Sequence, residues 1–173
     1  DLADKICAVI KRSIHIFSNF FDGKMIDSLI IGALTFVSMM IISLFGVPGF
    51  SNCALLVGIV VGITNMIPYF GPFLGGIPSI LLLCIYSLNS ALIFAILIII
   101  IQQLDGNLIG PKILGNSTGL RPLWIIFAIT LGGWIAGIPG MLLGVPCVAV
   151  IAGLLEDWVN ERLEAKNIDM PIV

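Results

Sequence analysis

The chain has 173 residues, of which 59% are hydrophobic and only 10% are charged, and its mean hydropathy is +1.17. These values exclude a soluble globular domain, whose surface needs many more charged side chains. A formal net charge of −2 and the lack of a basic stripe exclude nucleic acid as a partner. The composition therefore places the chain in a lipid bilayer.

The first 24 residues differ from the rest of the chain. Apolar side chains recur there every three or four positions, and polar side chains lie on the opposite face. This pattern predicts an amphipathic helix over residues 1–24 that lies in the membrane interface. Two runs without any Asp, Glu, Lys, Arg or His follow, Ser28–Leu104 with 77 residues and Pro122–Leu155 with 34. Since one crossing needs about 20 apolar residues, these runs hold several crossings.

Turn-forming residues divide the predicted transmembrane domain, residues 25–158, into spans. The segment 68–78 carries three Pro and three Gly, so we expect the third span to be broken. A charged cytoplasmic tail is expected over 159–173. The sequence thus predicts an all-α, polytopic membrane protein with Pro/Gly-broken helices and a C-terminal helical hairpin. Its expected spans are 25–45, 51–67, 70–88 (broken), 90–106, 122–138 and 140–158.

The basic residues predict the orientation of these spans. All eight Lys and Arg residues lie before the first span, in the loop 105–121 or in the tail, and the turns 46–52 and 87–90 contain none. Positive charges collect on the cytoplasmic side of membrane proteins. Both ends of the chain are therefore expected in the cytoplasm.

Two segments repeat the pattern Gly-Ile-Pro-small-apolar-Leu-Leu, at 76–82 and at 137–143. Paired broken segments point to the binding site of a transporter, because irregular backbone survives in lipid only inside protein or beside a wet cavity. The alternative is that the repeat arose by chance and that the kinks serve helix packing alone. The residues of these broken-helix motifs are Pro68, Gly71, Pro72, Gly75, Gly76, Pro78, Gly137, Pro139, Gly140 and Pro146.

A polar cluster ends the first charge-free run and contains Gln102, Gln103, Asp105 and Asn107. Ionisable groups near membrane depth are costly, so we interpret Asp105 as a proton- or cation-coupling carboxylate. In the alternative interpretation, Asp105 lies at the interface in an ion pair with Lys112 or Arg121. Thr64 and Asn65 either satisfy backbone groups before the Pro68 break or line a pathway.

Enzyme chemistry is not expected from this sequence. It contains no HExxH, P-loop or GxGxxG motif, and its one histidine, His15, lies outside the predicted spans. The four cysteines are scattered and form no CxxC pair. We therefore predict neither catalytic residues nor a cofactor or metal site.

Several motifs resemble the autoinducer-2 exporter family of bacterial membrane proteins. The resemblance is carried by Gln103-Leu-Asp-Gly-Asn-Leu-Ile-Gly-Pro-Lys-Ile-Leu-Gly115, by 117–124, by 131–146 and by the Pro/Gly motif of 67–78. It implies a multispan transporter of the inner membrane, assembled from several subunits, with this chain as the carboxy-terminal half of a longer member. Members export a quorum-sensing signal or exchange sodium or lithium for protons.

The expected function is secondary transport. The protein is expected to export a small signalling solute or to exchange Na⁺ or Li⁺ for H⁺, with the bilayer, further copies of the chain and the small solute or monovalent cation as partners. The alternatives are a non-transporting oligomeric scaffold, whose Gly-rich helices serve assembly, and a passive channel.

Overall fold

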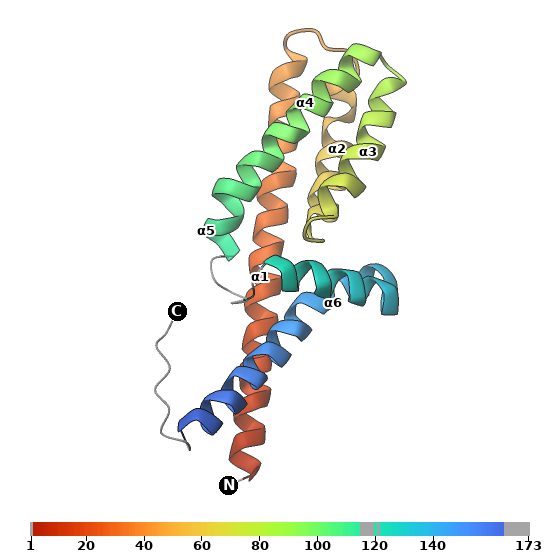
Figure 1. The fold of residues 1–173 in the computed structure, drawn as a ribbon. Coiled ribbons are helices and arrows are strands. Elements are labelled where there is room, and N and C mark those ends of the chain that lie inside the picture. Colours follow the sequence, from red (N-terminus) through yellow and green to blue (C-terminus); the bar gives the residue numbers. More distant parts are fainter. Residues whose placement is uncertain (1, 115–119, 121, 165–173) are drawn as a thin grey trace. The chain divides into compact units, whose positions relative to one another are not determined.

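The computed structural model describes residues 2–114, 120 and 122–164, and all regular elements in these ranges are helical. They follow the chain in the order α1 (Leu2–Ser43), α2 (Phe50–Asn65), α3 (Gly71–Cys84), α4 (Leu88–Leu104), the π-helix η1 (Asp105–Ile109), α5 (Gly110–Leu114) and α6 (Pro122–Glu164) (Figure 1). The chain divides into two compact units. Unit 1 contains 1–19 and 117–173, and unit 2 contains 20–116.

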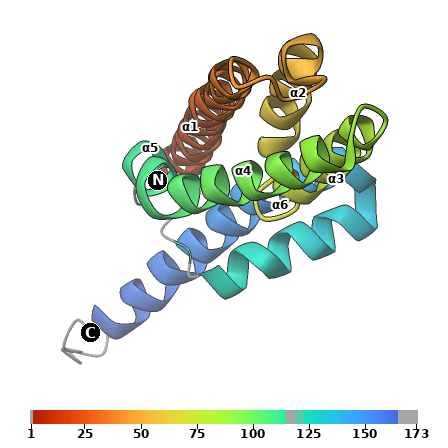
Figure 2. The ribbon, with the colours of Figure 1, turned by 90° about the horizontal axis from the view of Figure 1, so that it is seen from above.

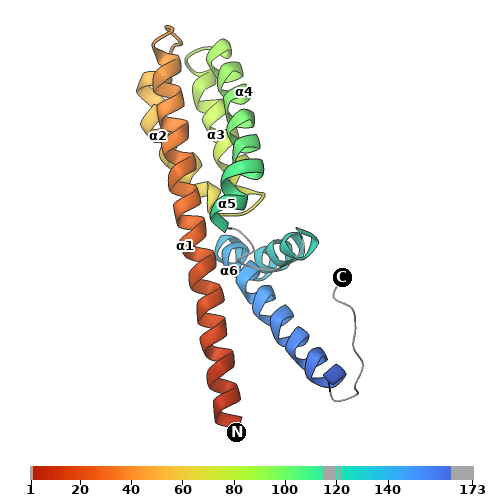
Figure 3. The same ribbon diagram turned by 90° about the vertical axis from the view of Figure 1, so that its left-hand side faces the viewer.

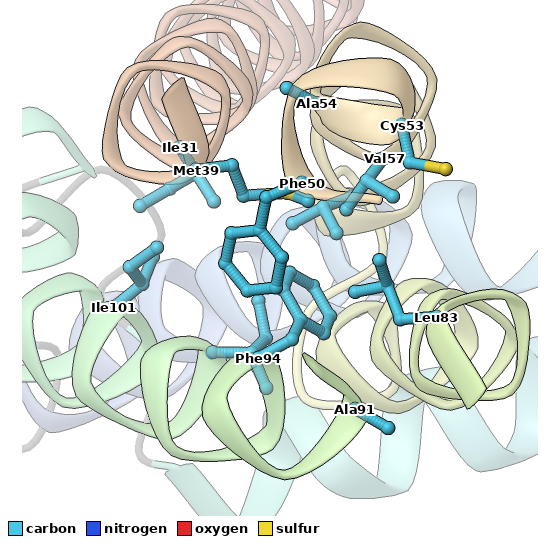
Figure 4. Packing of buried hydrophobic residues seen from close by; sticks show 12 residues of the cluster. Ile31, Met39, Phe50, Cys53, Ala54, Val57, Leu83, Ala91, Phe94 and Ile101 are labelled. Atoms are coloured by element: carbon cyan, nitrogen blue, oxygen red, sulfur yellow. The ribbon is translucent and has the colours of Figure 1, made fainter. Parts of the chain in front are cut away.

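Unit 2 is built around one apolar core. Seen end-on, the second half of α1 and the helices α2, α3 and α4 surround a common axis (Figure 2). Phe50 and Phe94 lie at the centre of this core and are fully buried, between Ile31 of α1 and Leu83 of α3 (Figure 4). Each helix thus contributes one apolar stripe to the interior, as expected for a helical bundle.

The outward faces of the helices are also apolar. Leu29, Leu55, Leu81 and Ile96 are more than 60% exposed, although their helices bury other residues in the core. Within the part of the chain that the structure describes, three helical stretches are long and apolar enough to cross a bilayer: Val9–Ser43, Leu88–Ile109 and Leu123–Glu156. Apolar surface on both sides of a helix is what lipid-facing helices require. The predicted all-α, polytopic membrane fold is therefore confirmed.

Helix α1 is continuous where two separate segments were expected. Residues 2–43 form one helix without a break near residue 24, because this stretch contains no Pro. Helices α2 and α3 are shorter than the expected spans. With 16 and 14 residues they rise about 24 and 21 Å, less than the ~30 Å of a hydrocarbon core. Where each helix enters and leaves the bilayer stays a prediction.

The expected break over 68–78 is wrong for its second half. Helix α3 begins at Gly71 and continues through Pro78. Pro72 lies in the first turn, where a helix needs no backbone N–H, and Pro78 costs one hydrogen bond without ending the helix. The irregular segment is thus limited to residues 66–70, in which Tyr69 takes a positive φ of 63°.

The expected loop after residue 105 is also partly helical. Helix α4 passes directly into η1 and then into α5, which ends at Leu114 (Figure 3). Pro111 is the second residue of α5, a place where proline is tolerated. Lys112 of α5 is exposed. Arg121 lies outside the described residues.

Helix α6 of unit 1 is the predicted C-terminal hairpin. The chain reverses at Ala136 and Gly137, and Gly137 has φ +61° and ψ −141°, a backbone conformation that only glycine adopts readily. The two limbs touch through small residues, because a Cβ on Gly132 would lie only 2.8 Å from the Gly140 carbonyl carbon. Pro139 follows the reversal in the first turn of the second limb, and the helix continues through Pro146.

Candidate functional site

A buried ion pair on α1 forms the centre of the candidate site. Lys24 and Asp27 are one helical turn apart, and the Lys24 Nζ atom lies 2.7 Å from Asp27 Oδ2. The side chains of Lys24 and Asp27 are only 8% and 0% exposed. Charges are almost never buried in this way unless they are paired, and their desolvation is costly even then. The pair therefore needs an explanation beyond stability.

Asn65 connects this pair to α2. It is the last residue of α2, it is buried, and its Nδ2 donates a hydrogen bond to Asp27 Oδ2 over 3.2 Å. The start of α3 lies directly against this end of α2, since a Cβ on Gly71 would lie 2.8 Å from the Asn65 Cα. Gly75 of α3 is similarly close to α2, because an added Cβ would lie 3.0 Å from the Val61 Cα. These glycines let α3 support the helix end that carries Asn65.

Asp105 brings a second carboxyl group to the same place. It is the first residue of η1, and its side chain faces Asp27, Lys24 and Asn65. A π-helix is rare and often marks a functional site, because the wide turn redirects a side chain. Gly110 lies beside this side chain, and a Cβ added there would be in ordinary van der Waals contact with Asp105 Oδ1, at 3.6 Å. With both carboxyls ionised, the two Asp and one Lys leave one negative charge.

Several polar atoms at this end of unit 2 are buried and have no hydrogen-bond partner among the described residues. They are Asp27 Oδ1, Ser28 Oγ, Gln102 Nε2 and Asp105 Oδ1. A buried carboxylate oxygen without a donor is costly. Because carboxylate oxygens bind protons and hard cations, the arrangement of Asp27 and Asp105 suits a small positive ion.

The comparisons with known proteins support a role in transport. A family model described as "AI-2E family transporter" matches residues 1–160. The chain belongs to the AI-2E transporter family. It is therefore a multi-pass membrane protein of a family of transporters rather than of enzymes, and the resemblance read from its motifs is confirmed. No solved structure matches this AI-2E family chain.

Three relatives show how much of a family member this chain represents. It is 35% identical over 146 residues to YrrI and 40% identical over 132 residues to YueF, both of Bacillus subtilis (strain 168). It is 27% identical over 150 residues to the AI-2 transport protein TqsA of Escherichia coli (strain K12). These alignments cover 84%, 76% and 86% of the chain but only 39%, 34% and 42% of the relatives. The chain thus spans about two fifths of their length.

The four polar residues expected to act together in this AI-2E family chain lie in different surroundings. Asp105 faces the buried pair, and Gln102, on the last turn of α4, is half-buried. Gln103 and Asn107 are exposed, and Asn107 Nδ2 donates to the backbone oxygen and to Oε1 of Gln103 over 2.8 and 3.2 Å. Among the described residues, the cation that faces Asp105 is Lys24 rather than Lys112.

Sequence reasoning missed Asp27, which directly precedes the long charge-free run. The available signal was the Lys24–Asp27 spacing of three residues, which places opposite charges one turn apart on a helix. Thr64 and Asn65, which were expected either to satisfy backbone groups or to line a pathway, have different roles. Thr64 Oγ1 donates to the backbone oxygens of Val60 and Val61, whereas Asn65 binds Asp27.

The two Gly-Ile-Pro repeats have different backbone conformations in this family member. Gly76 lies inside α3, whereas Gly137 forms the reversal of α6. Gly76 and Gly137 also belong to different units. The repeat in sequence is therefore not a repeat in structure.

Proposed function

We propose that this chain is part of an ion-coupled secondary transporter in which Asp27 and Asp105 form the coupling site. The observation that carries the proposal is the completely buried Asp27 carboxyl, which faces a second carboxyl and, among the described residues, a single lysine. Ionisable residues at membrane depth are retained where they bind substrate or relay ions. A site with one surplus negative charge binds a proton or a cation and changes its net charge when it does so.

The exchanged species are proposed from the family. Export of a small signalling solute follows the name of TqsA, an AI-2 transport protein, and exchange of Na⁺ or Li⁺ for H⁺ follows the charge of the site. The carrier is further proposed to act as a homo-oligomer in the bacterial inner membrane, with both ends of this chain in the cytoplasm. Gln102 has a buried amide nitrogen without a partner among the described residues, whereas the Gln103–Asn107 pair is exposed.

The experiment uses the complete protein that carries this chain, reconstituted in vesicles with an imposed proton or sodium gradient. The gradient is expected to drive movement of the counter-ion or solute, and Asp105→Asn is expected to abolish this dependence. Glu156→Gln is the matched control, because Glu156 is an exposed carboxylate of α6. Flux that ignores both gradients would indicate a channel, and no flux at all would favour the scaffold.

A further inference from the structure

The charges of the candidate site do not sum to zero. Asp27 and Asp105 supply two negative charges when ionised, and Lys24 supplies one positive charge. The Lys24 ammonium and the Asn65 amide both bind Asp27 Oδ2, so these two groups leave Oδ1 free. Asp27 Oδ1 and Asp105 Oδ1 are the buried carboxylate oxygens without a partner among the described residues. The open ligands and the surplus charge thus belong to the same two carboxyls.

We propose that Lys24 is a specificity-determining residue that limits this site to a single positive charge. The inference rests on the proposed coupling site and names the ion class that it accepts. One proton or one monovalent cation between Asp27 and Asp105 makes the occupied site neutral. A divalent cation would leave one uncompensated positive charge beside the fully buried Asp27 carboxyl, which is costly. Lys24 therefore excludes divalent cations.

The position of Lys24 fits this role. Its ammonium is a compact point charge, held within 2.7 Å of the carboxylate by a side chain that is itself buried. A lysine that served only as an interfacial anchor would extend towards water instead. The ammonium cannot coordinate a metal ion, so it changes the charge of the site without adding a ligand.

The test measures Ca²⁺ binding to the complete protein in detergent, by calorimetric titration in alkaline buffer. The unaltered protein is expected to bind no Ca²⁺ at this site. Lys24→Gln removes the positive charge, and Ca²⁺ is then expected to bind measurably, on the order of a hundredfold more tightly than the detection limit that the unaltered protein does not reach. In vesicles, Ca²⁺ should inhibit monovalent cation exchange by the variant only.

Three further variants separate charge from structure. Lys24→Arg keeps the charge and should continue to exclude Ca²⁺. The double variant Lys24→Gln with Asp105→Asn again has one negative charge, so it should lose the Ca²⁺ binding that Lys24→Gln acquires. Lys11→Gln is the matched control, because Lys11 is an exposed lysine of the same helix.

Two results overturn the inference. One is a folded Lys24→Gln protein that still ignores Ca²⁺, and the other is Ca²⁺ binding by Lys24→Arg, which would make size rather than charge the cause. If Ca²⁺ binding follows the predicted pattern but the unaltered protein shows no ion-coupled transport, the proposed function fails and the role of Lys24 stands. If transport is coupled and Lys24→Gln excludes Ca²⁺, only the role of Lys24 fails.

Discussion

The buried pair of α1 predicts an unequal effect of removing its two partners. Breaking a buried ion pair costs about 3–5 kcal/mol, because one charge is left without compensation. In Asp27→Ala, the Lys24 ammonium still faces Asp105, so we expect a cost near the lower end, about 3 kcal/mol. In Lys24→Met, the carboxyls of Asp27 and Asp105 face each other without a cation, so we expect about 5 kcal/mol at neutral pH.

The assay is equilibrium unfolding of the purified protein in mixed micelles at neutral pH. The double variant Lys24→Met with Asp27→Leu removes both charges and should recover much of the loss, because an apolar pair of similar volume often replaces a buried ion pair without cost. The result that refutes the reasoning is a loss below about 1 kcal/mol for both single variants, as measured for solvent-exposed pairs. Equal losses would refute the role of Asp105 as a second partner.

Three further predictions concern backbone and packing, and the same unfolding assay measures each. Gly32→Val places side-chain atoms against Gly58 of α2, since an added Cβ already lies 2.9 Å from the Gly58 oxygen, and should cost about 1–3 kcal/mol; an unchanged stability would mean that α1 and α2 are not in close contact. Gly137→Ala should cost about 1–3 kcal/mol, because the residue keeps φ near +61°, and a neutral effect would argue against the sharp reversal. Ser87 caps α4 by accepting a hydrogen bond from the Asn89 N–H over 3.2 Å, so Ser87→Ala should cost about 1 kcal/mol and Ser87→Asp almost nothing. Equal losses in the two Ser87 variants would contradict the cap.

The fold class was readable from the sequence because it depends on composition. Seventy-seven residues without charge can form only membrane-spanning or deeply buried helices, and the Gly-Ile-Pro segment at 137–139 marks the reversal of α6. The helical state of 71–78 was not readable. Its prolines and glycines disfavour a helix locally, but Gly71 and Gly75 are needed for the close contact with α2. Tertiary packing here overrides local propensity.

Half of the candidate site could be found in the sequence. Asp105 stands out because it ends an apolar helix. Its partners are 78 and 40 residues away in Asp27 and Asn65, and no local pattern joins positions so distant. The nearer cations, Lys112 and Arg121, were the obvious partners by sequence distance. Only the bundle of unit 2, together with the π-helical turn at η1, brings Asp105 to the buried pair.

Ion-dependent transport by Asp27→Asn, Asp105→Asn and the double variant tests the shared site most directly. Two residues that act as one unit are strongly non-additive, whereas independent residues multiply their effects. The account predicts that each single variant loses the response to an imposed ion gradient and that the double variant is no worse than either. Partial losses in the single variants that multiply in the double variant would show that Asp27 and Asp105 do not serve one ion.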